Sequence, residues 1–220
     1  GLPYDDIHQH LHHFVYAVIN NNIVAVAGLE MYNDCALLRS LVVDGNLSTP
    51  NVGIHLGAPI VPITLNHVLK NEARLEDAIY EHESGTKIIP SSLSVKELRK
   101  INSSKLKSVA QKVKRLADIV ILDSAAGLGE EALAAIESGD ELIIVTNPEI
   151  PAVADALKTA KVAAQMGKEI RGVIITRVRG RKTEMPIVNI RDMLELPILG
   201  IIPEDDNVQA SLVKKDALIH

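Results

Sequence analysis

The chain has 220 residues, of which 47% are hydrophobic and only 2% aromatic. This length predicts one compact domain or a domain with a small appendage, and a core of Ile, Leu, Val and Ala suits a buried parallel sheet covered by helices. The net charge of −5 argues against a general nucleic-acid surface, and the single cysteine, Cys35, excludes an internal disulfide and fits a reducing compartment.

The first 43 residues favour antiparallel strands. Asp5–His13 is polar and fits a short helix, whereas His13–Ile19 and Ile23–Glu30 are two β-rich runs. They are joined by Asn20-Asn21-Asn22, and Asn tolerates the left-handed turn conformations that a hairpin needs. A third apolar run, Cys35–Val43, follows. We therefore expect a hairpin and then a strand.

After Asp44 short apolar strands alternate with helical segments. The expected helices are Leu65–Lys70, Leu75–His82, Ser94–Lys100, Lys105–Ala117, Glu130–Ser138, Pro151–Met166, Pro186–Leu194 and Asn207–Lys214. The expected strands are Thr86–Pro90, Asp118–Leu122, Glu141–Thr146, Ile170–Thr176 and Ile198–Ile202. This alternation predicts an α/β fold with a mostly parallel sheet flanked by helices, and with the antiparallel N-terminal hairpin at the edge of the sheet or over it.

A carboxylate at the end of an apolar strand is the first candidate functional residue. Asp123 follows the strand Asp118–Leu122 and precedes the small-residue turn 124–129, which leads into a helix. Ligands of open α/β sheets bind at the carboxyl ends of the strands. A carboxylate in that place can hold Mg²⁺ through water.

Four blocks of the sequence resemble the MinD/ParA family of P-loop ATPases. They are VVDGNLSTPNVGIHLG (Val42 to Gly57), DSAAGLGEEA (from Asp123), VTNPEIPAVADALKTAKVA (Val145 to Ala163) and GIIPEDDNVQAS (Gly200 to Ser211). The resemblance covers residues 42–220 and implies a P-loop NTPase-like fold with ATP and Mg²⁺ as ligands.

The resemblance also implies roles for single residues. Asp44 corresponds to the switch I aspartate beside Mg²⁺ and the attacking water, and Asp123 to the Walker B aspartate. Asn46 stands where many members of the family have a second aspartate; an amide can orient water but cannot take its proton. The residues implied on the nucleotide side are Asn147, Pro203, Glu204 and Asp205.

Each of these residues also has a simpler interpretation. Asp44 and Asp123 can merely end strands, and Asn147-Pro148 can be an ordinary turn. Glu204 and Asp205 can cap the final helix.

The phosphate-binding loop of the family has no counterpart in this sequence. Such a loop wraps phosphates with glycine amides and a Lys, but the only Gly-Lys pair, Gly167-Lys168, is followed by Glu169 and lacks a glycine-rich approach. In the family this loop would lie upstream of Asp44. We therefore expect ATP and Mg²⁺ binding to be weak or absent, in a domain that also lacks its C-terminal end.

Residues 1–43 instead resemble the front half of a GNAT acetyltransferase. The resemblance rests on FVYAVINNNIVAVAGLEMYNDCALLRSLVV (Phe14 to Val43), with GLPYDDI before it. The R-G-x-G-x-G/A-like loop that would hold the acetyl-CoA pyrophosphate does not follow. We therefore place a boundary between a GNAT-like segment, 1–43, and a MinD/ParA-like domain, 44–220. A natural fusion, an engineered chimera and an assembly artefact all stay open as its origin.

Three functions follow from these resemblances: a MinD/ParA-like ATPase in cell division or partitioning, a GNAT-type N-acetyltransferase, or a non-catalytic interaction module. The first implies a cytoplasmic homodimer that closes on ATP, with a possible regulatory protein partner. We expect no sequence-specific nucleic acid. Membrane contact in the family needs a C-terminal amphipathic helix, and none is recognised before His220.

A histidine cluster and a basic cluster each allow two interpretations. The first cluster is His8, His10, His12 and His13, and the second is Arg177, Arg179, Arg181 and Lys182. His8 and His12 would share one helix face, yet no carboxylate-plus-His signature follows, which favours a solvated helix over a metal site. The basic cluster follows a strand and fits either a solvated loop or a contact with an acidic partner or phosphate.

Overall fold

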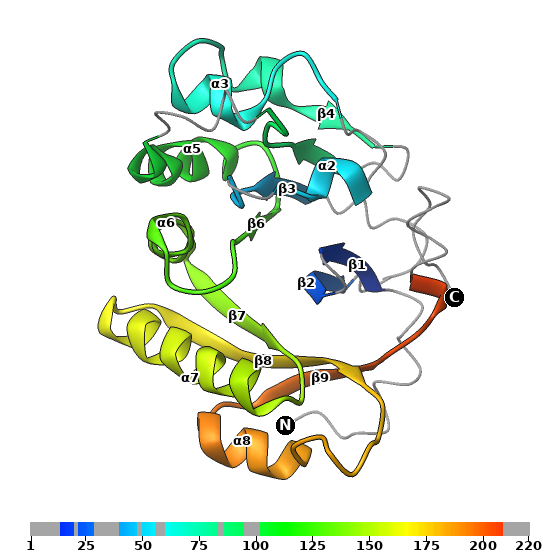
Figure 1. Cartoon of the computed structure of the whole chain (residues 1–220). Coiled ribbons are helices and arrows are strands. Elements are labelled where there is room, and N and C mark those ends of the chain that lie inside the picture. The colour runs from blue at the N-terminus through cyan, green and yellow to red at the C-terminus, as the bar shows by residue number, and fades with distance from the viewer. Residues whose placement is uncertain are drawn as a thin grey trace, which may run out of the picture.

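The computed structural model describes residues 14–19, 22–28, 40–47, 50–55, 60–82, 86–94 and 102–208. Its strands are β1 (Phe14–Ile19), β2 (Asn22–Gly28), β3 (Ser40–Asp44), β4 (Tyr80–Glu81), β5 (Lys87–Ile89), β6 (Ile119–Asp123), β7 (Glu141–Thr146), β8 (Glu169–Val178) and β9 (Ile198–Pro203). Its α-helices are α2 (Val52–His55), α3 (Leu65–Leu69), α5 (Leu106–Val113), α6 (Glu130–Ser138), α7 (Ile150–Gln165) and α8 (Ile187–Leu194). Helices flank mostly parallel strands, so the predicted fold class is confirmed (Figure 1).

The mostly parallel strands form two separate sheets, which we call the first and the second half-sheet. The first half-sheet has the strand order β4-β5-β3-β6. β3 lies parallel to both β5 and β6. Leu41 and Val43 pack into a core with α3 and α5, while Val42 packs against Val52 of α2 and Ile88. Burial on both faces explains the continuous apolar run of β3. The predicted strand in this run is described from Ser40 onward, where it pairs in parallel with β6.

One predicted helix is wrong. In place of Leu75–His82 the chain forms a 3₁₀ turn, Glu76–Ala78, and then the edge strand β4, which pairs antiparallel with β5. The Tyr80 hydroxyl accepts a hydrogen bond from the Ile63 N–H (3.1 Å) and donates one to the Ile63 carbonyl (2.9 Å). These bonds and the strand pairing hold the segment in an extended conformation, so tertiary contacts override its helical pattern.

The second half-sheet has the parallel strand order β7-β8-β9. Helices α7 and α8 cover one face and bury Ile144, Val173, Ile175 and other apolar side chains (Figure 1). Gly172 lies where the register shifts and has φ +153°; a Cβ there would come within 2.5 Å of the Pro197 carbonyl oxygen, so a side chain is excluded.

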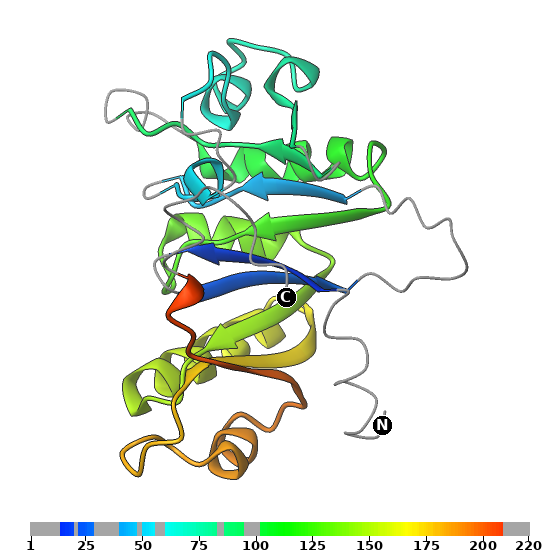
Figure 2. The ribbon, with the colours of Figure 1, turned by 90° about the vertical axis from the view of Figure 1, so that its right-hand side faces the viewer.

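The predicted N-terminal hairpin is confirmed, but its expected place is not. β1 and β2 pair antiparallel, and β2 contacts β6, β7 and β8. Figures 1 and 2 show the hairpin between β6 and β7 instead of at the outer edge of the sheet or over it. Among the described strands, β6 pairs only with β3 and β7 only with β8. We call this interruption between β6 and β7 the sheet break.

Most other boundaries agree with the expectations. Helix α6 and strand β7 match, and α7 carries Pro151 in its first turn as predicted. Helix α5 is shorter than predicted at both ends, because a 3₁₀ turn, Ser103–Lys105, precedes it and the helix ends at Val113. The predicted helix Asp5–His13 and nearly all of Ser94–Lys100 and Asn207–Lys214 lie outside the described residues. Within the described ranges, the helices are all too short or too polar to cross a bilayer.

Candidate functional site

Two buried carboxyl groups end neighbouring strands. Asp44 of β3 stands opposite Asp123 of β6 in the parallel register, and their exposed fractions are 0% and 1%. Asp44 Oδ1 and both Asp123 oxygens accept no hydrogen bond from the described residues. The Ser124 N–H lowers the pKa of Asp123 without forming a hydrogen bond to its carboxyl group. These oxygens are available to a ligand.

Burial changes the titration of both carboxyl groups, and the neighbouring Asp44 adds to the effect at Asp123. Burial raises the pKa of Asp44 to about 7. Burial raises the pKa of Asp123 to about 8, with a further contribution from the negative charge of Asp44. Two adjacent carboxylates in a dry site do not both ionise readily without a cation or strong donors.

The loop after β5 contacts both the backbone carbonyl and the side chain of Asp44. The Ser91 hydroxyl donates to the Asp44 carbonyl oxygen (2.6 Å), and the Ser91 N–H makes a long contact with Asp44 Oδ2 (3.5 Å). This loop is itself fixed by Asn66, which is fully buried in α3 and accepts from the Ser92 N–H (2.9 Å). A chain of contacts from α3 through the serine pair therefore positions Asp44.

The residues after Asp44 pack directly against the end of β6. A Cβ on Gly45 would come 2.6 Å from the Asp123 carbonyl oxygen. Asn46, which follows, is 5% exposed, and its N–H lowers the pKa of Asp44. The glycine thus permits the close approach of the two carboxylate-bearing strand ends.

Sequence reasoning missed three positioning residues, namely Gly45, Asn66 and Ser91. The glycine directly after Asp44 and the serine pair directly after a predicted strand were visible signals. Asn66 gave none, because its role depends on a contact with Ser92, 26 positions away.

Asn147 lies on the other side of the sheet break, directly after β7. Its Oδ1 atom is buried and has no hydrogen-bond partner among the described residues. The strand end is held by the Thr176 hydroxyl, which donates to the Thr146 carbonyl oxygen (3.3 Å). The side-chain oxygen of Asn147 thus lacks a donor among the described residues, as the Asp123 oxygens do.

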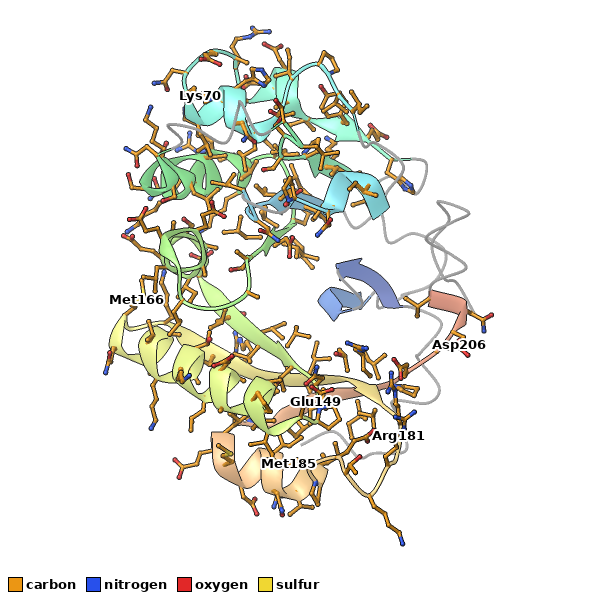
Figure 3. The ribbon with its side chains drawn as sticks, in the orientation of Figure 1. Lys70, Glu149, Met166, Arg181, Met185 and Asp206 are labelled. Carbon is orange, nitrogen blue, oxygen red and sulfur yellow. The ribbon has the colours of Figure 1, made fainter. Side chains whose placement is uncertain are left out.

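The residues that follow β7, β8 and β9 lie at one end of the second half-sheet. Figure 3 places Glu149, Arg181 and Asp206 there, and places Met166, which precedes β8, at the opposite end. The strands of both halves point toward the same side in Figure 2. The predicted residues at strand ends therefore share one edge of the fold.

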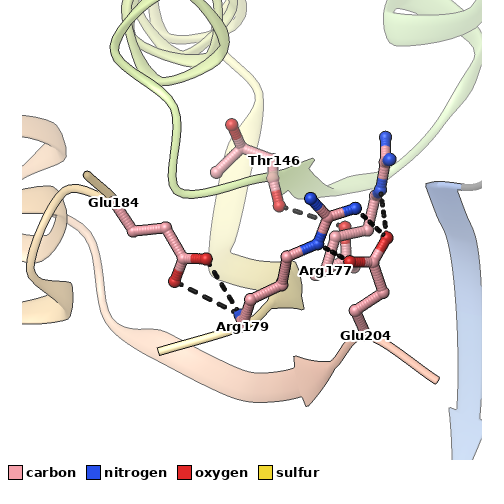
Figure 4. Close-up of polar contacts among 6 residues, drawn as sticks. Thr146, Arg177, Arg179, Glu184 and Glu204 are labelled. Carbon is pink, nitrogen blue, oxygen red and sulfur yellow. Dashed lines mark hydrogen bonds and ion pairs between the residues drawn. The ribbon is translucent and has the colours of Figure 1, made fainter. Parts of the chain in front are cut away.

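Glu204 is bound by two arginines of the basic cluster. Its carboxylate pairs with Arg177 (Nε to Oε1, 3.5 Å) and closely with Arg179 (Figure 4). The Glu184 carboxylate accepts from the Arg179 and Gly180 N–H groups, each at 3.0 Å. Two of the four cationic side chains of the cluster thus share one carboxylate within the chain, which a fully solvated loop would not show.

Asp205 and Pro203 have different surroundings. Asp205 Oδ1 accepts from the Asn207 N–H (2.8 Å), which is the capping arrangement considered for this residue. The Glu204 carboxylate pairs with Arg177 and Arg179 instead of capping the helix. Pro203 ends β9 opposite Val178 and is exposed.

The oxygen atoms at the strand ends fit Mg²⁺. This ion is commonly held by one or two carboxylates together with waters and substrate phosphates. In the described ranges no three His, Cys, Asp or Glu side chains gather into a metal-binding group, so Asp44 and Asp123 are the two carboxylates available here. The histidines at positions 8, 10, 12 and 13 lie outside the described residues.

Comparisons with known proteins agree with this architecture. The family model for the CobQ/CobB/MinD/ParA nucleotide binding domain matches residues 19–218. An uncharacterised ATP-binding protein of Methanocaldococcus jannaschii is 39% identical over 168 residues, which are 76% of this chain and 64% of that protein. The chain therefore spans less than two thirds of that relative's length.

Solved structures give the same result. The septum site-determining protein MinD of Pyrococcus horikoshii, complexed with Mg-ADP, superposes with a TM-score of 0.78 at 34% identity over 82% of this chain and 74% of that one. MinD in an Aquifex aeolicus MinC:MinD complex shares the fold at 23% identity, with a TM-score of 0.72 over 82% of this chain and 75% of that one. The chain belongs to the CobQ/CobB/MinD/ParA nucleotide-binding domain family.

Proposed function

We propose that this chain is a MinD/ParA-type domain with a site for Mg²⁺ and ATP at the carboxyl ends of β3 and β6, and that it binds the nucleotide weakly. One observation carries this proposal. Asp44 and Asp123 are buried opposite each other, and three of their four carboxyl oxygens have no donor among the described residues, which fits a cation. The M. jannaschii relative described as ATP-binding and the Mg-ADP complex of P. horikoshii MinD support it.

Asp44 and Asp123 would hold Mg²⁺, with Asn147 close to the nucleotide. When bound, the ion neutralises phosphate charge. Asp44 orients a water through its fixed position between Ser91 and Gly45. Asn46 can help to hold that water, but its amide cannot accept the proton, which makes hydrolysis slow. Pro203, Glu204 and Asp205 would flank the adenine, and Arg177 and Arg179 keep the Glu204 carboxylate in place.

The expected weakness has an electrostatic cause. A lysine and glycine amides of the kind that neutralise phosphates in the family have no counterpart in residues 1–43. Two carboxylates without them repel a triphosphate unless a metal is present. Loss of each such donor lowers a rate by about 10²–10³. ATP turnover by this chain should therefore be negligible.

The partners proposed for the chain follow from its family. They are a second copy of the chain and a regulatory protein, in a cytoplasmic role in cell division or partitioning. The MinC:MinD complex of A. aeolicus is the support for a protein partner.

The test is to rebuild the front of the domain. Residues 1–42 are replaced with a MinD-type strand, glycine-rich loop and first helix, and nucleotide affinity is measured by calorimetry. We expect Mg²⁺-dependent ATP binding that Asp123→Ala removes. A rebuilt chain that folds, as judged by circular dichroism, and still binds no ATP would show that the site is wrongly assigned.

A further inference from the structure

One carboxylate, that of Glu204, lies between two guanidinium groups directly after β9. Arg179 Nη2 donates to Glu204 Oε1 (2.6 Å), and Arg177 Nε lies 3.5 Å from the same oxygen (Figure 4). The Glu204 N–H donates separately to the Val178 carbonyl oxygen (3.1 Å), which fixes the backbone of Glu204 beside β8. The carboxylate can therefore leave the arginines without detaching β9 from β8.

The two arginines carry more positive charge than Glu204 can neutralise. Each guanidinium is always protonated, whereas one carboxylate supplies a single negative charge. The side chains of Arg177, Arg179 and Glu204 are 33%, 37% and 26% exposed, so that small ions in solution reach all three. Ion pairs this exposed are weak and are screened by salt. An anion with two charges on one group would therefore compete with Glu204 for the arginines.

The loop that follows β8 holds its position before any ligand binds. The Arg179 and Gly180 N–H groups both donate to the Glu184 carboxylate, each at 3.0 Å, and Gly180 has the left-handed φ of +69°. Consecutive N–H groups that converge on one carboxylate form a backbone nest for an anion. The Glu184 N–H donates in turn to the Arg181 carbonyl oxygen (3.0 Å), which closes the loop. The arginine side chains thus start from a fixed backbone.

Two features of this loop are not explained by folding alone. Arg177 has a φ of +58°, a left-handed conformation that is uncommon for a residue with a side chain. Residues held in such conformations cluster at ligand sites. Arg181 and Lys182 are exposed and make no ion pair within the described ranges, so they add positive charge that the chain itself leaves available.

We propose that Arg177 and Arg179 form a binding site for a phosphate group, and that Glu204 occupies this site in the ligand-free chain. The ligand is the terminal phosphate of a small molecule, which carries close to two negative charges at neutral pH and displaces the Glu204 carboxylate. The planar guanidinium groups suit a phosphate because each offers parallel N–H groups to two of its oxygens. The site uses neither Asp44 nor Asp123 and needs no Mg²⁺, so it goes beyond the proposed function.

The first test measures diphosphate binding by calorimetry in EDTA at low salt. Glu204→Gln removes the competing charge, and Glu149→Gln removes an equal charge from an exposed residue at the same end of the second half-sheet (Figure 3). An apparent affinity scales with the fraction of molecules whose site is open, so removing an occupant present in about nine chains of ten raises it about tenfold. We expect that gain in Glu204→Gln and less than about twofold in Glu149→Gln. Equal gains, or no gain in Glu204→Gln, would overturn the proposal.

Arginine side-chain signals test the site in the unmodified chain. Diphosphate added to chain labelled with ¹⁵N-arginine should shift the Nε–H signals of Arg177 and Arg179, but not that of Arg191, which is exposed and pairs with Asp192. In the Glu204→Gln chain, Arg179→Lys keeps the charge but loses the planar fork, and should lower diphosphate affinity at least about fivefold. Equal shifts at Arg191, or full affinity in the Arg179→Lys chain, would reduce the site to general charge attraction and contradict the proposal.

The remaining measurements identify the source of the phosphate and separate this inference from the proposed function. A gain for ADP in EDTA equal to the gain for diphosphate in Glu204→Gln supports the site with a nucleotide as the source, and a gain for diphosphate alone supports it with a free phosphate. If the rebuilt chain binds Mg-ATP through Asp123 while Glu204→Gln leaves diphosphate affinity unchanged, the phosphate site is wrong and the nucleotide site stands. If Arg177 and Arg179 bind diphosphate while the rebuilt chain binds no ATP, the phosphate site stands and the nucleotide site is wrong.

Discussion

Asp44 and Asp123 occupy equivalent positions at the ends of adjacent parallel strands, and neither carboxyl group reaches solvent. Gly45 keeps the two strand ends close, since a Cβ there would meet the Asp123 carbonyl oxygen at 2.6 Å. The pair is therefore built into the backbone arrangement, and its protonation is coupled to the stability of the fold.

Stability should fall as pH rises when no divalent cation is present. The folded chain holds the Asp44 and Asp123 protons up to pKa values of about 7 and about 8, whereas an unfolded carboxyl group loses its proton near 3.8. The folded state thus binds more protons between these values, so the free energy of unfolding decreases with pH across this window. Urea unfolding in EDTA at about pH 5.5 and about pH 8.5 measures the slope.

Two comparisons check the cause of that slope. Asp123→Asn should flatten it and raise the free energy of unfolding at the higher pH by about 1–3 kcal/mol. Mg²⁺ should stabilise the unmodified chain more at the higher pH, where the carboxylates ionise, and should stabilise Asp123→Asn much less. A slope that Asp123→Asn leaves unchanged would contradict the assignment.

Gly45→Ala should destabilise the chain and weaken Mg²⁺ binding. The new methyl group would force the turn after β3 away from β6, and overpacking of this kind costs about 1–3 kcal/mol. Gly200→Ala is the matched control, because a Cβ at that position meets nothing within 4 Å. Thermal unfolding with and without Mg²⁺ measures both effects. Equal losses in the two variants would show that the Gly45 contact is unimportant.

The chain should not bind acetyl-CoA usefully, although residues 1–43 resemble the front of an acetyltransferase. The hairpin is present, but the loop whose amides would hold the pyrophosphate does not follow it. Calorimetry with acetyl-CoA measures this directly. Dissociation constants in the low micromolar range would refute the prediction.

Asn46→Asp, made in the rebuilt chain, should raise turnover more than affinity. Asn46 lies beside Asp44 and is nearly buried. A carboxylate at this position could accept a proton from water, and that interaction matters mainly in the transition state. Single-turnover rates and dissociation constants for ATP separate the two effects. A gain in affinity with an unchanged rate would exclude Asn46 from the hydrolytic site.

The sequence predicted most of the alternating strands and helices after Asp44. Helix α6 and strand β7 agree with their expected bounds because their apolar patterns match the local structure. The segment Leu75–His82 was misassigned because the hydrogen bonds of Tyr80 to Ile63 and the pairing with β5 lie far away in the sequence. Resemblance pointed to Asp44 and Asp123, which the structure places opposite each other, but neither resemblance nor periodicity could place the hairpin in the sheet break.

The unmodified chain offers the most direct measurement of the central claim. Mg²⁺-dependent ATP binding and turnover are measured for the chain and for Asp123→Ala, with Asp192→Ala, an exposed residue of α8, as the control. The account predicts weak binding that depends on Mg²⁺ and on Asp123 but not on Asp192, together with negligible turnover. Robust turnover abolished by Asp123→Ala would contradict the predicted deficiency, and ATP binding that Asp123→Ala leaves unchanged would contradict the site itself.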